Sequence, residues 1–120
     1  MRKNIVKDKS FGFAIRVIRL YQLLVSENKE YVLSKQLLRS GTSVGAMVRE
    51  AEHAESKSDF KHKLSIAQKE INESIYWLEL LKETDYISTA KFVSLNSDAV
   101  EIMKLLTAII KTTKSNINKR

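Results

Sequence analysis

The stretch that decides the fold is Lys35–Leu81, KQLLRSGTSVGAMVREAEHAESKSDFKHKLSIAQKEINESIYWLELL. Apolar or small residues recur there at every third or fourth position, which is the spacing of residues along one face of an α-helix. The polar run Glu55-Ser56-Lys57-Ser58 interrupts this pattern. The stretch therefore predicts two long amphipathic helices joined by a tight polar turn.

Each of these two helices has a continuous apolar face. The first is expected over residues 34–55, with an inward face of Leu37, Leu38, Gly41, Val44, Gly45, Val48 and Ala51. The second is expected to follow Ser58 as its N-cap, with an inward face of Phe60, Leu64, Ala67, Ile71, Ser74, Ile75, Leu78 and Leu81. A glycine costs up to about 1 kcal/mol in a helix interior. We therefore interpret Gly41 and Gly45, one turn apart, as positions of close helix packing; a local kink is the alternative.

Two further amphipathic segments flank this stretch. Segment 11–26 has Ser10 as its expected N-cap and an apolar stripe of Ala14, Val17, Ile18, Tyr21, Leu24 and Val25. Segment 88–114 places inward Leu95, Ala99, Ile102, Leu106, Ile109 and Ile110, although Asn96-Ser97-Asp98 offers a later start. The 120 residues include no proline and three glycines, which suits long helices with short connections. We expect one all-α domain over 1–120, an up-down-up-down antiparallel four-helix bundle with flexible tails at 1–9 and 115–120.

Composition argues against several classes of protein. There is no cysteine, so the chain has neither disulfides nor thiol chemistry. The charged N-terminus does not resemble a signal peptide, and no apolar run approaches the roughly 20 residues that span a membrane. We expect a cytoplasmic protein that does not contact a membrane.

Catalytic and metal-binding patterns are incomplete. Ser40, Thr42 and Ser43 have no histidine on the same segment to act as a base. Glu50-x-x-His53 matches half of the di-iron signature of four-helix bundles, but the second half and two further glutamates are missing. We therefore predict no catalytic residue, no metal site, no cofactor and no enzymatic activity.

The formal net charge of +7 is concentrated at the two ends of the chain. Residues 1–30 carry seven basic and three acidic side chains, and residues 88–120 carry six and two. If the first and last helices are adjacent, their excess positive charge would form one basic surface of the kind that binds phosphate groups. The candidate nucleic-acid-binding residues are Lys9, Arg16, Arg19, Lys104, Lys111 and Lys114. The alternative is a solvated face that maintains solubility.

Trp77 and Leu80 lie beside the apolar seam of their helix rather than on it. A helix with this much apolar surface outside its seam is unusual for a monomer. We therefore predict that Trp77 and Leu80 belong to an oligomer interface.

The segments LLRSGTSVGA, Glu50-Ala51, KLSIAQKE and YWLELL resemble one family. It comprises the four-helix bundle proteins encoded in intervening sequences of bacterial 23S ribosomal RNA genes. The resemblance covers nearly the whole chain. It departs from the family at Met47, where asparagine is usual, which puts any polar role of that position in doubt.

The resemblance implies a left-handed antiparallel bundle, assembly into small homo-oligomeric rings, with a pentamer as the expected state, and no established enzymatic activity. It also implies similarity to the accessory bundle protein of diversity-generating retroelements, which partners a reverse transcriptase and nucleic acid. Arg39 belongs to the family-like motif. An inter-subunit ion pair is the first interpretation of Arg39, and direct phosphate contact is the second.

These observations lead to two hypotheses about function. The first is a non-enzymatic basic homo-oligomer that binds structured RNA or a ribonucleoprotein through phosphate contacts. The second is an interaction scaffold, or accessory subunit, that binds a protein partner and whose positive charge is incidental.

Overall fold

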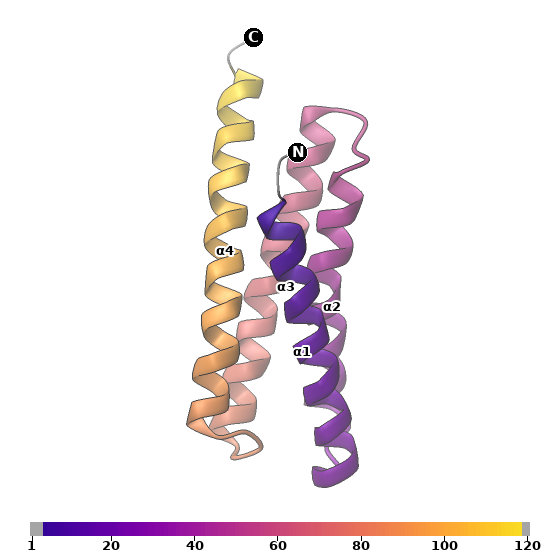
Figure 1. Cartoon of the computed structure of the whole chain (residues 1–120), viewed down its shortest axis with the longest axis vertical. Helices are drawn as coiled ribbons and strands as arrows, with labels where there is room; N and C mark the ends of the chain where they lie inside the picture. The colour runs from indigo at the N-terminus through magenta and orange to yellow at the C-terminus, as the bar shows by residue number, and fades with distance from the viewer. Residues whose placement is uncertain (1–3, 119–120) are drawn as a thin grey trace.

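The computed structural model of the chain describes residues 4–118, and within that range it contains four α-helices and no strand. The helices are α1 (Ile5–Asn28), α2 (Leu33–Ala51), α3 (Lys57–Glu83) and α4 (Thr89–Asn118). They lie side by side along the long axis of a body measuring 53 × 27 × 21 Å (Figure 1). Each helix packs against the next along the chain, and α4 also packs against α1. The prediction of an all-α protein with four helices is confirmed.

Two helices begin earlier than predicted because a different residue caps them. The Oδ1 atom of Asn4 accepts a hydrogen bond of 3.1 Å from Lys7 N, so α1 starts at Ile5. The predicted cap, Ser10, lies inside the helix and is buried. At α3, Ser56 Oγ accepts from Asp59 N at 3.0 Å, so Ser56 is the N-cap in place of Ser58. These two corrections reflect competition between neighbouring residues that can all cap.

Most of the other helix boundaries also differ from those expected. Helix α2 ends at Ala51 rather than Glu55, and α4 starts as expected after Ser88, whose Oγ accepts from Lys91 N at 3.1 Å. The later start at 96–98 is not used. Residues 5–9 and 115–118 of the predicted tails are helical, and the flexibility of the tails stays a prediction. The remaining tail positions 1–3 and 119–120 lie outside the described residues.

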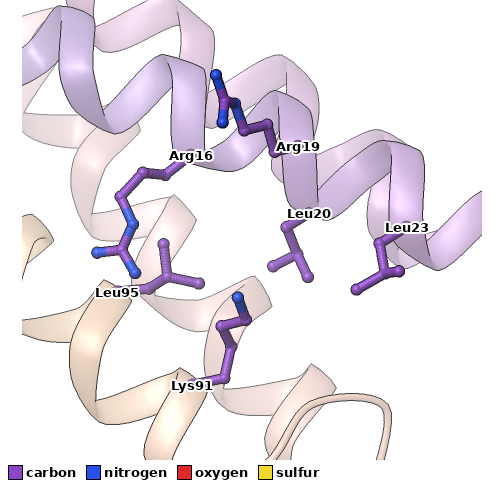
Figure 2. Close-up of a pocket in the computed structure, with 6 residues that line it drawn as sticks. All are labelled: Arg16, Arg19, Leu20, Leu23, Lys91 and Leu95. Atoms are coloured by element: carbon purple, nitrogen blue, oxygen red, sulfur yellow. The ribbon is translucent and has the colours of Figure 1, made fainter.

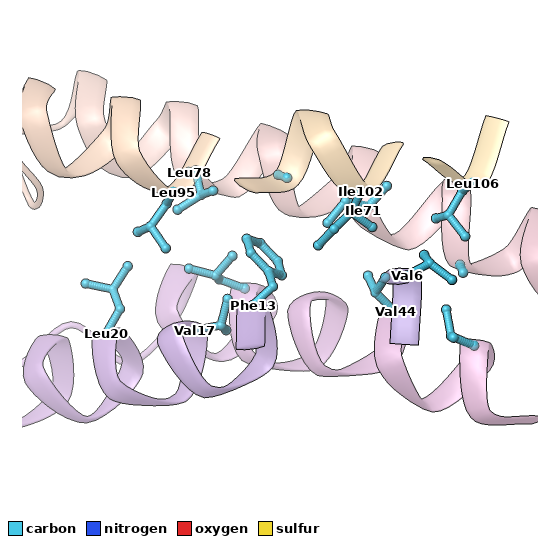
Figure 3. Packing of buried hydrophobic residues seen from close by; sticks show 14 of the residues in the cluster. Val6, Phe13, Val17, Leu20, Val44, Ile71, Leu78, Leu95, Ile102 and Leu106 are labelled. Carbon is cyan, nitrogen blue, oxygen red and sulfur yellow. The ribbon is translucent and has the colours of Figure 1, made fainter. Parts of the chain in front are cut away.

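The core runs the length of the bundle and combines residues from all four helices (Figure 3). The inward faces predicted for α2 and α3 are confirmed, since Leu37, Val44 and Val48 are buried opposite Leu64, Ile71 and Leu78. Helix α4 contributes Leu95, Ile102 and Leu106. Met47, at the position where the family usually has asparagine, is half-buried and packs against this core.

The predicted stripe of α1 is partly wrong. The helix buries Phe13, Val17, Leu20 and Leu24, whereas Ile18, which was expected inward, is 39% exposed. The observed stripe is rotated by about 60° from the predicted one, at 3.6 residues per turn. Because α1 also carries exposed Phe11 and Ile15, its apolar pattern fits more than one rotation. Packing against α2 and α4 selects one of them.

Residues 29–32 connect α1 to α2, and Glu30 organises this connection. The N-cap position of α2 is Val32, whose side chain cannot accept a hydrogen bond. The Glu30 carboxylate replaces it and accepts from the backbone N–H groups of Val32, Leu33 and Ser34 at 3.1, 3.0 and 2.7 Å. Burial of Glu30 would raise the pKa of this carboxyl, but the hydrogen bonds outweigh it and the pKa is lowered.

Candidate nucleic-acid interface

The seam between α1 and α4 is held by ion pairs. Arg16 Nη1 lies 2.6 Å from Asp98 Oδ2, and Arg16 Nη2 donates to Ser94 Oγ at 2.8 Å. Lys9 Nζ lies 3.1 Å from Glu101 Oε1. Two of the six predicted phosphate-binding cations therefore have carboxylate partners within the chain. Lys9 and Arg16 therefore join two helices, and phosphate contact by them stays a prediction.

The three lysines predicted on α4 lie on a different face from this seam. At about 100° per residue, Lys104, Lys111 and Lys114 lie about 90–170° around α4 from the row of α1-facing residues Ser94, Asp98 and Glu101. All three lysines are exposed and have no ion-pair partner within residues 4–118. The six predicted cations therefore do not form one continuous basic surface. They divide between the α1–α4 seam and the outer face of α4.

A cleft of about 410 Å³ opens in the seam near the start of α4 (Figure 2). Its lining residues are Arg16, Arg19, Leu20, Leu23, Lys91 and Leu95. Lys91 was not predicted as a site residue. It lies one turn before Leu95 on the same side of α4, so the i, i+4 spacing to a predicted core residue was the signal that could have placed it in the seam.

The predicted interface residue Arg39 has its partners in its own chain. Its guanidinium pairs with Glu73 and lies 3.5 Å from Glu70 Oε1, both on α3. Trp77 Nε1 also donates to Glu73 Oε1, at 3.2 Å, and the Trp77 ring packs against the core. Arg39 therefore needs no second subunit for an ion pair. The assignment of Arg39, Trp77 and half-buried Leu80 to an oligomer interface stays a prediction.

We expect Arg39→Ala to lower the free energy of unfolding by about 1–2 kcal/mol, because the substitution leaves two carboxylates without their cation. Glu70 is only 7% exposed, so its charge is poorly solvated. Denaturant unfolding followed by circular dichroism, at two protein concentrations, measures the change.

Two further variants test the cause. Adding Glu70→Gln to Arg39→Ala should recover part of the loss, since it removes the unpaired charge, whereas Arg19→Ala should change little. Unchanged stability of Arg39→Ala together with a smaller oligomer would contradict the intrachain role.

Two hydroxyl groups of the Ser40–Ser43 segment have hydrogen-bond partners within the bundle. Ser40 Oγ and Ser74 Oγ lie 2.9 Å apart in the buried α2–α3 interface. Thr42 Oγ1 donates to Leu38 O at 2.8 Å, which is the bond to the preceding turn that is common for hydroxyls in helices. Glu50 pairs with Lys63 at 3.3 Å. Among the described residues, no group of three or more His, Cys, Asp or Glu is placed to hold a metal ion.

The helices are amphipathic rather than apolar throughout. Within residues 4–118, none of the four combines the length and the apolar character required to cross a bilayer.

These features define the class of protein as a small all-α domain of four helices, closed by ion pairs between its first and last helices. The sequence model of the 23S rRNA-intervening sequence protein family matches residues 2–108, and the chain belongs to this family. The predicted resemblance is thus confirmed.

A solved structure supports the same fold. The chain is 58% identical to a protein of unknown function from the S23 ribosomal protein family of Bacteroides thetaiotaomicron VPI-5482. The two structures superpose with a TM-score of 0.90, over 92% of this chain and 99% of that chain. No curated protein matches the sequence.

Proposed function

We propose that this chain is a non-enzymatic, self-associating helical module of the cytoplasm that binds structured RNA, alone or within a ribonucleoprotein, through phosphate contacts. The family name refers to ribosomal RNA, and the net charge of +7 suits a polyanionic partner. Enzymatic activity is not part of the proposal, because Ser40 is engaged in helix packing, Thr42 in a bond within its own helix and Glu50 in a surface ion pair.

One observation carries the RNA-binding proposal. Both acidic residues of α4, Asp98 and Glu101, pair with cations of α1. The outer face of α4 is therefore left with exposed Lys104, Lys111 and Lys114 and no carboxylate of its own helix to neutralise them. These lysines span ten residues, or about 15 Å of helix, which is long enough to contact more than one phosphate of an RNA backbone.

Self-association is supported by apolar surface. Phe11, Ile15 and Ile18 follow one another on the outer face of α1 and are 53%, 36% and 39% exposed. Monomeric proteins rarely expose large contiguous apolar patches, of more than a few hundred Å². We infer a homo-oligomer, with the pentameric ring implied by the family resemblance as the first state to test.

The subunit in such an oligomer is proposed to be an up-down-up-down antiparallel bundle. In Figure 1 the α1–α2 and α3–α4 connections lie at one end of the molecule and the α2–α3 connection lies at the other. The left-handed twist is proposed from the family resemblance and from the usual geometry of four-helix bundles.

Fluorescence anisotropy of a labelled RNA hairpin, titrated with the protein at several salt concentrations, tests RNA binding. We expect affinity to fall steeply with salt, with a log–log slope of several units. The double variant Lys104→Glu/Lys111→Glu should lower the affinity by about 10- to 100-fold and should reduce the slope by about one unit for each lysine that is replaced.

The matched control makes the same change in net charge at positions on other faces of the bundle. Lys35→Glu/Lys69→Glu alters the net charge equally, on exposed positions of α2 and α3. Equal loss of affinity in both double variants would show non-specific attraction to the whole molecule. Absence of binding by the unaltered protein at low salt would refute the proposal and favour the second candidate, a protein scaffold that uses the apolar face of α1.

A further inference from the structure

The cleft between α1 and α4 has an apolar floor of three leucines, one of which is open to solvent. Leu20 and Leu95 belong to the core and are 4% and 1% exposed, whereas Leu23, next to them on α1, is 47% exposed. Figure 2 shows Leu20 and Leu23 directed from α1 toward α4. The volume of about 410 Å³ falls in the range of small-ligand sites. The leucine side chains can therefore contact one apolar or planar group of modest size.

One wall of the cleft is a guanidinium group with a fixed orientation. Arg16 is bound at Nη1 by Asp98 and at Nη2 by Ser94, so its plane cannot turn freely. Figure 2 shows this group next to Leu95, at the edge of the floor. Arginine planes immobilised in this way are surfaces on which nucleic-acid bases stack. The charge of Arg16 is already balanced by Asp98, so only the flat face of its guanidinium group is left to contact a ligand.

Two cations near the floor are not balanced. Lys91 extends from α4 toward α1 and over the cleft, whereas Arg19 lines the edge of the cleft on α1 and points away from α4 (Figure 2). Both are exposed, and neither has an ion-pair partner in the described range 4–118. An anion is therefore favoured beside the floor. The occupant that fits has a negative charge next to an apolar, planar group.

We propose that this cleft binds a single unpaired nucleotide of the RNA, with its base over the leucine floor between the Arg16 plane and Leu23 and its phosphate at Lys91. The inference rests on the proposed RNA binding and adds to it the kind of RNA, which is a loop, bulge or single strand. A duplex offers no free base face, because its bases are stacked and paired inside. Duplex RNA can therefore reach the α4 lysines but cannot fill the cleft.

The experiment compares two labelled RNAs with equal numbers of phosphates, an oligouridylate strand and a blunt duplex. We expect the unaltered protein to bind the single strand more tightly. Leu23→Ser should weaken single-strand binding about 5- to 10-fold and leave duplex binding unchanged, because it removes apolar contact without altering charge. Lys91→Glu should weaken single-strand binding about 10-fold or more.

Matched controls lie on the outer faces. Val93→Ser removes an apolar side chain that is 58% exposed on α4, and Lys111→Glu reverses a lysine of the outer face. Val93→Ser should leave both affinities unchanged, and Lys111→Glu should lower both equally. Since all four positions are exposed, circular dichroism should show each variant folded.

NMR with a single nucleotide provides a second test of the cleft. Uridine monophosphate should shift the methyl NMR signals of Leu20, Leu23 and Leu95, whereas inorganic phosphate should not.

The outcomes separate the two proposals. If neither RNA binds, the proposed function fails and this inference fails with it. If both RNAs bind equally, and Leu23→Ser behaves like Val93→Ser, RNA binding stands and the cleft site is wrong. If Leu23→Ser or Lys91→Glu dissociates the oligomer without changing single-strand affinity, the cleft contacts a second copy of the chain and the inference is overturned.

Discussion

Replacing Glu30 with alanine should lower the free energy of unfolding by about 2–4 kcal/mol, a large loss for a side chain outside the hydrophobic core. The Glu30 carboxylate accepts hydrogen bonds from three consecutive backbone N–H groups at the start of α2. Val32, at the N-cap position, has no side-chain acceptor that could take over. The alanine variant would leave these donors unpaired, and the N–H of Ser34 is buried. Denaturant unfolding followed by circular dichroism measures the loss.

The contribution of Glu30 should also depend on pH. Burial opposes ionisation of this carboxyl, but the hydrogen bonds outweigh burial, and the pKa is lowered from an ordinary value of 4.5. The unfolded chain therefore takes up this proton at a higher pH than the folded chain. It follows that the stabilisation is complete above the unfolded-state pKa and is lost as the pH falls through the lowered folded-state pKa.

Glu30→Gln isolates the charge, because glutamine retains one acceptor oxygen. Its destabilisation, about 1–2 kcal/mol near neutral pH, should shrink as the pH falls below the ordinary carboxyl pKa. Glu27→Ala is the matched control, since Glu27 is exposed and lies in the last turn of α1. A capping role would be excluded if Glu27→Ala and Glu30→Ala had equal effects. It would also be excluded if the stability difference between the unaltered protein and Glu30→Gln did not change with pH.

The sequence predicts the buried face of a helix well where the apolar residues favour one rotation of the helix about its axis. In α2 and α3 the apolar seam continues without a shift along the helix, so periodicity identified Leu37, Val44, Ile71 and Leu78 as core residues. In α1 apolar residues lie on two adjacent faces, and periodicity selected a stripe that includes Ile18. Only contact with the neighbouring helices distinguishes the two faces of α1. Local propensity does not contain that information.

The candidate site could be predicted only in part, for a related reason. Composition located the excess charge on the first and last helices. The pairing of Arg16 with Asp98, 82 residues away, depends on the relative rotation and axial position of two helices. The same geometry decides that Lys9 is neutralised and that Lys91 faces the cleft. The spacing along one segment could place Lys91 on the same side of α4 as Leu95, but it encodes neither of the two ion pairs.

The second large effect is expected at Gly41, where alanine should destabilise the protein by about 1–3 kcal/mol although alanine is the better helix former. A Cβ atom at Gly41 would lie 2.8 Å from Val17 Cγ2 and 2.9 Å from Val17 Cγ1. Val17 is fully buried and β-branched, so its side chain cannot rotate away without a cost. Helix α1 would have to move away from α2. Thermal and denaturant unfolding of Gly41→Ala should both show the loss.

Gly45, one turn later, provides the matched control. A Cβ atom there would lie 3.5 Å from Ser10 O, an ordinary contact distance. Gly45→Ala should therefore be neutral or stabilising by up to about 1 kcal/mol, through its helix propensity alone. In a Val17→Ala background the cost of Gly41→Ala should largely disappear, since both clashing methyl groups are gone. Two results would contradict this explanation: equal stability of the two glycine variants, or an unchanged cost of Gly41→Ala in the Val17→Ala background. In either case the close approach of α1 to α2 would not be the reason for glycine at position 41.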